Sequence, residues 1–157
     1  MSKTTRATQF LAKAGIAFDV LQYAYEAGAE RIGLQAAEAI GEPPARVLKT
    51  LMVLVDGKPA CCVVPSDGEL SMKRVAAAFG GKSAAMMPPA EAEKATGYHV
   101  GGISPFGSRK KAPVALDAAV LAEPYVIING GQRGVMLRLA PADAVRVLDA
   151  VTAPLLA

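Results

Sequence analysis

The chain has 157 residues, of which 52% are hydrophobic and 20% are charged. This length suits one domain, and the apolar content excludes a disordered polar segment, which would lack the residues to build a core. Lysine and arginine total 17 against 14 acidic residues, so the formal net charge is +3 and a polyanionic partner is weakly favoured. Aromatic residues make up only 5%, which argues against a long stacking surface for single-stranded nucleic acid.

The sequence also gives an expectation of where in the cell the protein works. No run reaches the roughly 18 apolar residues of a membrane helix, and the basic N-terminus is not followed by the apolar segment of a secretory signal. Cys61 and Cys62 are neighbours in a predicted strand, so their side chains point to opposite faces and a disulfide is disfavoured. Both are expected to be buried hydrophobes, and they form no metal-binding cluster with the single His99. We therefore expect a cytoplasmic protein that contacts no membrane and uses no metal or organic cofactor.

The first predicted elements are a helix, a strand and a second helix. Residues 4–14 carry apolar side chains at helical spacing and end at Gly15. Alternation of apolar and polar residues over 16–23 predicts a strand. After a polar connection, residues 34–40 return to helical spacing and stop at a Gly-Glu-Pro-Pro sequence.

A β-hairpin is predicted next. Residues 47–55 and 60–64 have strand character and flank Asp56-Gly57, a strong short-range signal for a hairpin turn. A helix follows over 71–79, with Ser71 as its predicted N-cap.

The middle of the chain is predicted to be less regular. A short apolar run at 83–87 leads to Pro88-Pro89, which can begin a helix over 90–95. Residues 97–113 contain repeated glycine and proline and are predicted to form a loop.

The last elements are strands and a closing helix. Residues 114–121 and 125–128 have strand character, and the turn at 129–131 leads to a further strand over 134–139. Residues 142–151 have helical spacing. Because helices and strands are mixed and two hairpins occur, we expect one domain over 1–157 with a mixed or antiparallel, curled sheet and helices outside it.

The segment Thr96–Gly107, TGYHVGGISPFG, is the most informative stretch. The paired Gly101 and Gly102 allow a ligand to approach the backbone, whose successive N–H groups can bind an oxyanion or a ribose hydroxyl. Ser104 adds a hydroxyl group. The same pattern also fits a structural turn, and neither the GxxxxGK[ST] nor the GxGxxG phosphate-binding spacing occurs.

Three blocks in order closely resemble the YbaK-type family, freestanding relatives of the editing domain of bacterial prolyl-tRNA synthetases. They are LKTLMV from Leu48, ATGYHVGGISPFG from Ala95 and NGGQRG from Asn129, and the resemblance runs from Phe10 to Leu148. It implies an α+β fold, with a mixed, largely antiparallel, barrel-like sheet surrounded by helices. It also implies hydrolysis of the ester of mischarged aminoacyl-tRNA, Cys-tRNA(Pro) above all. The implied partners are the acceptor end of aminoacyl-tRNA and prolyl-tRNA synthetase.

The resemblance also implies roles for individual residues. Lys49, Gly101 and Gly102 take the catalytic positions: the ammonium group would hold a phosphate or the aminoacyl group, and the loop's backbone donors would stabilise charge on the ester carbonyl. The residues implied to contact substrate are Tyr23, Ile32, Thr50, Met52, Ile103, Ser104, Asn129 and Met136.

Three positions depart from the cysteine-specific branch of the family. Met136 stands where that branch has an aspartate, Asn129 where it has a serine, and Ile32 where it has an aromatic residue. An apolar side chain at 136 should reshape the amino-acid pocket. Alanine, serine and threonine esters therefore join cysteine esters as candidate substrates.

The run Arg109-Lys110-Lys111 follows the glycine-rich loop and is predicted to contact acceptor-stem phosphates, with Arg46 and Arg133 extending the patch. A solvated loop is the alternative interpretation of this run.

Two other functions stay open at this level. One is a non-catalytic tRNA-binding module with the same fold. The other is a hydrolase with its own nucleophile, either Ser104 with His99 and Asp117 or one of the cysteines, although nearness in sequence does not establish the geometry of a triad.

Overall fold

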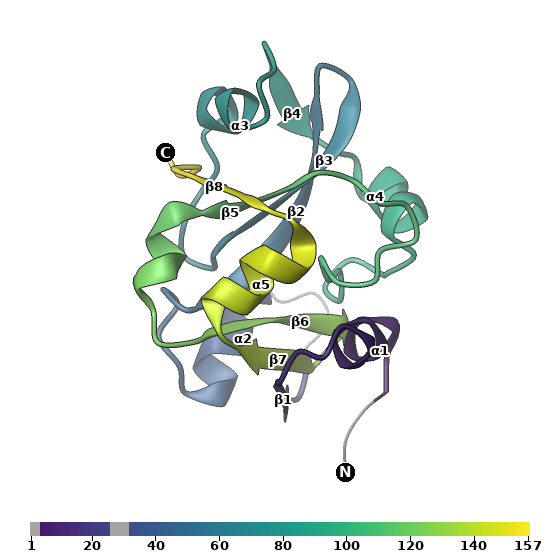
Figure 1. Cartoon of the computed structure of the whole chain (residues 1–157), viewed down its shortest axis with the longest axis vertical. Helices are drawn as coiled ribbons and strands as arrows, with labels where there is room; N and C mark the ends of the chain where they lie inside the picture. The colour runs from purple at the N-terminus through teal and green to yellow at the C-terminus, as the bar shows by residue number, and fades with distance from the viewer. Residues whose placement is uncertain (1–3, 26–31) are drawn as a thin grey trace.

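The computed structural model describes residues 4–25 and 32–157. Helices and strands are mixed along this part of the chain (Figure 1). In order they are α1 (Arg6–Lys13), β1 (Asp19–Gln22), α2 (Ile32–Ile40), β2 (Val47–Val55), β3 (Lys58–Pro65), α3 (Met72–Ala78), β4 (Ala84–Met86), α4 (Pro89–Thr96), β5 (Val114–Asp117), the 3-10 helix η1 (Ala118–Ala122), β6 (Val126–Gln132), β7 (Val135–Leu139), α5 (Pro141–Leu148) and β8 (Val151–Ala153).

The strands of the described residues form one mixed sheet. Its order is β1-β7-β6-β2-β3-β5-β8, and β4 pairs with β2 outside this path. The hairpins β2–β3 and β6–β7 are antiparallel, whereas β2 pairs parallel with β6 and β5 pairs parallel with both β3 and β8. Helices lie around the sheet, with α5 crossing in front of it in Figure 1. The predicted α+β fold with a mixed sheet is therefore confirmed.

One edge of β2 is divided between two partner strands. Val47 and Leu48 pair with β6, and residues 53–55 pair with β4. Between these two pairings, the described residues place no strand beside residues 49–52 on this edge. Met52 marks the limit of the gap, because its carbonyl accepts a hydrogen bond from Met87 N–H at 3.1 Å. Since alternate residues of a strand direct their backbone groups to the same edge, the N–H and C=O of Thr50 point into this opening.

The two faces of β2 and β3 pack into different hydrophobic clusters. Leu48 and Cys61 belong to one cluster, and Val53 and Cys62 belong to another. The two cysteines are buried free thiols, as predicted. Burial raises the pKa of both, that of Cys62 to about 12, so both stay protonated at neutral pH and neither is an activated nucleophile.

Two predicted elements end earlier than the sequence pattern suggests. The strand predicted over 114–121 stops at Asp117, whose carboxylate accepts the N–H of Ala119 at 3.2 Å and of Leu155 at 2.9 Å. The helix predicted over 142–151 ends at Leu148, because Asp149 adopts φ +50° and turns the chain. The residues beyond it form β8, which pairs with β5. Within the described residues no helix has the length and apolar character to cross a bilayer.

Candidate active site

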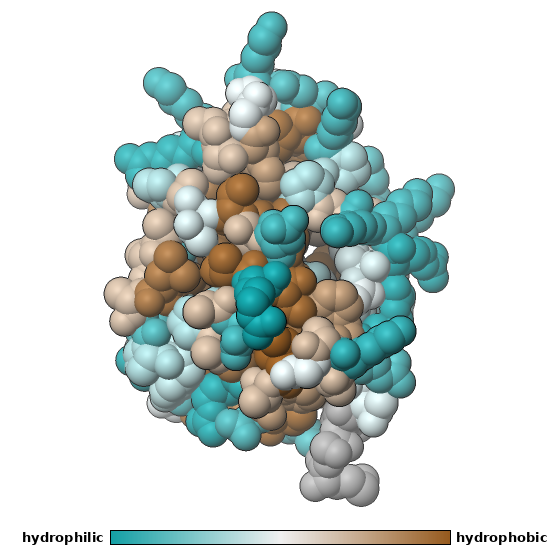
Figure 2. Space-filling model, in the orientation of Figure 1, coloured by the Kyte–Doolittle hydropathy of each residue, from teal (hydrophilic) through white to brown (hydrophobic). Residues whose placement is uncertain are grey.

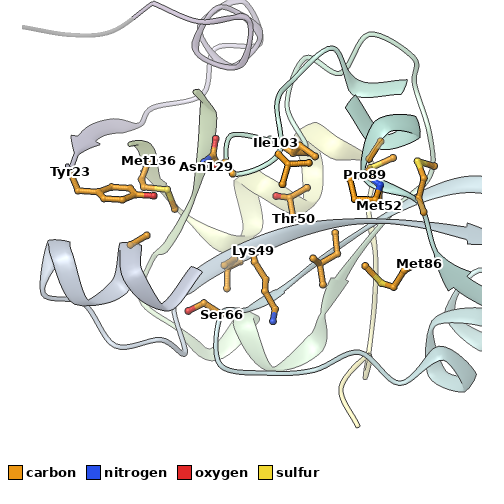
Figure 3. A pocket seen from close by; sticks show the side chains of 17 residues that line it. Tyr23, Lys49, Thr50, Met52, Ser66, Met86, Pro89, Ile103, Asn129 and Met136 are labelled. Carbon is orange, nitrogen blue, oxygen red and sulfur yellow. Dashed lines mark hydrogen bonds between the residues drawn. The ribbon is translucent and has the colours of Figure 1, made fainter. Parts of the chain in front are cut away.

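A cavity of about 330 Å³ opens at the divided edge of β2 (Figure 3). It brings together residues that are far apart in the sequence, from the end of β1 to β7. Eight of the predicted site residues line it: Tyr23, Lys49, Thr50, Met52, Gly101, Ile103, Asn129 and Met136. Other lining residues were not predicted, among them Ala36, Ser66, Met86 and Met87, since no local motif marks them.

Lys49 and Thr50 enter the cavity from opposite faces of β2. Figure 3 shows Lys49 on the side of Ser66 and Thr50 on the side of Ile103, as expected for consecutive residues of a strand. The hydroxyl oxygen of Thr50 is buried and has no hydrogen-bond partner among the described residues. A buried polar atom without a partner costs about 1–3 kcal/mol, so this oxygen is a point where a bound ligand would be stabilised.

One end of the cavity is apolar with a single hydroxyl. Tyr23 and Met136 lie beside each other there in Figure 3, and Ala36 of α2 also lines the cavity. Burial raises the pKa of the Tyr23 phenol above its ordinary value, so this group is neutral at physiological pH. The described part of this end of the cavity therefore suits a small, uncharged group of a bound ligand. Ile32 begins α2, but its side chain lies outside the described residues.

The glycine-rich loop is held from two sides at Val100. The Val100 N–H donates to the Glu93 carboxylate at 2.9 Å, and the Val100 carbonyl accepts from Arg133 Nε at 2.8 Å. The hydrogen bond from Val100 is the main reason that the pKa of Glu93 lies below its ordinary value. Arg133 also lies over the Tyr25 ring, 5.3 Å from its centroid. The sequence did not predict that Glu93 and Arg133 hold this loop, because they belong to different elements.

Gly102 and Ser104, two predicted site residues, do not line this cavity. The Gly102 N–H donates to the His99 carbonyl at 2.8 Å, and Ser104 Oγ accepts from Phe106 N–H at 3.2 Å. Ser104 instead lines a second cavity of about 400 Å³. The loop thus contributes residues to both cavities: Gly101 and Ile103 line the first, and Ser104 lines the second.

Substitution of Gly102 by alanine is expected to displace the loop. An added Cβ would lie 2.8 Å from Arg133 N and 3.0 Å from Gln132 C, and these backbone atoms cannot swing aside. We expect a loss of about 1–3 kcal/mol in the free energy of unfolding, measured in urea. Gly68→Ala is the matched control, because its Cβ would meet only the flexible end of Leu156. Equal stability of the two variants would contradict the expectation.

The basic run is attached to α4 and reaches the second cavity. The N–H groups of Arg109 and Lys110 donate to Thr96 and Ala95 carbonyls, and Lys111 lines the second cavity. In Figure 2, long hydrophilic side chains project from the side of the molecule on which α4 lies. The sequence placed this run beside the glycine-rich loop, and in the structure Lys111 lines the second cavity together with Ser104 of that loop and does not line the first.

The residues of the alternative triad are engaged elsewhere. The His99 side chain is 84% exposed and lies 3.6 Å from Glu93. The Ser104 hydroxyl accepts from Phe106 N–H, and the Asp117 carboxylate accepts from the N–H groups of Ala119 and Leu155. Their described contacts therefore do not assemble a Ser-His-Asp relay.

Known proteins resemble this chain in sequence and in fold. A protein of Enterococcus faecalis named "Putative Cys-tRNA(Pro)/Cys-tRNA(Cys) deacylase EbsC" is 37% identical over 107 residues, which are 67% of this chain and 65% of that protein. A proline–tRNA ligase of Acidithiobacillus ferrooxidans is 32% identical over 87 residues, 55% of this chain and 15% of the ligase. The matched regions thus span less than two thirds of either relative.

The fold itself matches a crystal structure described as that of "a putative trans-editing enzyme for prolyl tRNA synthetase". The TM-score is 0.85 at 23% identity, over 99% of both chains. The architecture is thus that of a known class of α+β domains. Residues 29–147 match the aminoacyl-tRNA editing domain family, and the chain belongs to that family.

Proposed function

We propose that this protein is a trans-editing hydrolase that deacylates mischarged aminoacyl-tRNA, with Cys-tRNA(Pro) or a tRNA carrying another small amino acid as its substrate. The observation that carries the proposal is the single cavity into which Lys49, Thr50 and Gly101 converge from separate parts of the chain. Membership of the editing-domain family and the name of the Enterococcus relative support the same reaction.

The proposed reaction is hydrolysis of the ester between the amino acid and the terminal ribose. Water attacks the carbonyl carbon, and negative charge builds on the carbonyl oxygen. The Lys49 ammonium group and the Gly101 N–H supply positive charge and a hydrogen-bond donor for it. The ribose oxygen then leaves, takes a proton and becomes a hydroxyl, while the amino acid departs as a carboxylate. Protonated cysteines and the dispersed triad residues favour water over a protein nucleophile.

The chemistry of the cavity limits the amino acid. Tyr23 and Met136 supply one neutral hydroxyl and an apolar wall, and Ala36 leaves room for a short side chain. Cysteine, alanine, serine and threonine esters fit this description. The acceptor end of tRNA is the proposed macromolecular partner, with prolyl-tRNA synthetase as a candidate second partner in the cytoplasm.

A deacylation panel tests the proposal. The purified protein is incubated with tRNA(Pro) carrying labelled cysteine or alanine, with Ser- and Thr-tRNA, and with correctly charged Pro-tRNA(Pro) as the control. We expect at least one mischarged species to lose its label about tenfold or more faster than in buffer, while Pro-tRNA(Pro) stays intact. Loss at the buffer rate for every species would refute the proposal. If tRNA were nevertheless bound, with an affinity that falls with salt, the result would support a non-catalytic tRNA-binding module.

A further inference from the structure

The Asn129 side chain connects the glycine-rich loop to the last residues of β6. Its Nδ2 donates to the Gly101 carbonyl at 3.1 Å, and its Oδ1 accepts from the Gly131 N–H at 2.7 Å. Only 8% of the residue is exposed. The orientation of the amide is settled by its partners, because the flipped amide would set N–H against N–H and oxygen against oxygen.

These contacts leave one amide of the loop without a partner. The N–H and C=O of Val100 are bonded to Glu93 and Arg133, and the Gly101 C=O is bonded to Asn129. The Gly102 N–H donates within the loop. Among the described residues the Gly101 N–H has no hydrogen-bond acceptor, and Gly101 lines the first cavity at φ +91°. A glycine in this region rotates easily about its two backbone bonds, so the peptide on each side of it needs a contact to keep one orientation.

We infer that Asn129 is a positioning residue: it holds the Gly101–Gly102 peptide through the Gly101 carbonyl, while Arg133 holds the preceding peptide through the Val100 carbonyl. Together the two contacts fix Gly101, so that its N–H stays available to the substrate in the cavity. The sequence resemblance placed Asn129 among the residues that contact substrate, but both ends of its amide are occupied by backbone groups. The side chain acts through Gly101. The catalytic consequence rests on the proposed function, whereas the contact itself can be tested without substrate.

Asn129→Asp is the most selective variant, because it keeps the shape and the acceptor for Gly131 and removes the donor to Gly101. At neutral pH the new carboxylate would face the Gly101 carbonyl and repel it. When protonated, it regains an O–H donor, so the contact should return as the pH falls through the carboxyl pKa. Gln132→Glu introduces the same charge on an exposed side chain three residues further along β6, and it is the matched control.

Hydrogen–deuterium exchange of the protein alone provides the first measurement. At neutral pH we expect the amides of residues 99–103 to exchange about tenfold faster in Asn129→Asp than in the unmodified protein or in Gln132→Glu, with β2 and β3 unchanged. At about pH 4, near the ordinary pKa of an aspartate, protection should return in part after correction for intrinsic exchange, since only the protonated carboxyl can donate. Equal protection at neutral pH would overturn the inference. If the whole protein loosens, Asn129→Ala replaces this variant with the same expectation at neutral pH.

Deacylation kinetics provide the second measurement. Loss of a positioned donor should lower kcat about 10- to 100-fold and leave KM within about threefold. A raised KM with unchanged exchange would mean that Asn129 contacts substrate directly, and it would overturn the inference. If the unmodified protein deacylates no substrate, the proposed function fails, while the exchange result still decides the role of Asn129.

Discussion

Replacement of Lys49 by alanine is expected to lower kcat/KM for deacylation about 100-fold or more, equivalent to about 2.7 kcal/mol of lost transition-state stabilisation. Lys49 is the cationic side chain among the described residues that line the first cavity. Its charge would oppose the negative charge that develops on the ester carbonyl, and no other lining group can replace it. Single-turnover deacylation of the substrate identified by the panel measures the effect.

A matched control separates this effect from a general loss of positive charge. Lys58→Ala removes an exposed lysine at the β2–β3 turn, away from the cavity, and should leave kcat/KM within about twofold, as for most surface substitutions. Lys49→Arg is not a conservative control, because a planar guanidinium has a different reach and shape from an ammonium group. Activity of Lys49→Ala equal to that of Lys58→Ala would remove Lys49 from the mechanism.

Phe106→Ala is expected to reduce the free energy of unfolding by about 3–5 kcal/mol, the range for truncation of a buried phenylalanine. Phe106 is fully buried, and its ring stacks on Phe10 of α1 with 6.4 Å between centroids. The Phe106 carbonyl also accepts a 2.6 Å hydrogen bond from the Tyr98 hydroxyl. The cavity left by the ring would thus loosen the end of the glycine-rich segment Thr96–Gly107.

Urea unfolding measures this loss, and Phe79→Ala is the control. Phe79 lies at the end of α3 and is partly exposed, so its truncation removes less buried surface. The cost at Phe106 should exceed that at Phe79 by about 1 kcal/mol or more. Since domains are typically stable by only about 5–15 kcal/mol, Phe106→Ala should also lower the yield of folded protein. Equal costs at the two positions would contradict the expectation.

Local patterns predicted most helices and the β2–β3 hairpin well, because their signals lie within each segment. The second hairpin was predicted with its turn at 129–131, but β6 continues through a register shift to Gln132 and the turn lies at 133–134. Ser71 caps α3 by accepting from Arg74 N–H at 3.2 Å, and Asp56-Gly57 forms the turn between β2 and β3. The strand β8 was missed, because its pairing with β5 joins residues more than thirty positions apart. The end of β5 at Asp117 was missed for the same reason, because the Asp117 carboxylate accepts a hydrogen bond from the distant Leu155 N–H.

The sequence predicted which residues line the candidate site more successfully than it predicted the contacts between them. The sequence blocks brought Lys49, Gly101 and Asn129 to attention, and all three line one cavity. They could not show that Asn129 bonds to Gly101, or that Ser104 and Lys111 serve a different cavity. Those outcomes depend on how the loop packs against α4 and the β6–β7 turn, which is a property of tertiary structure.

Met52 is shared by the linings of both cavities, so one thioether side chain forms part of the wall between them. A methionine is unbranched and has three rotatable side-chain bonds, which makes it a compliant boundary. Rotation of this side chain would transfer space from one cavity to the other without movement of β2. The volume of the first cavity therefore depends on the conformation of a core side chain, Met52, as well as on the residues at its opening.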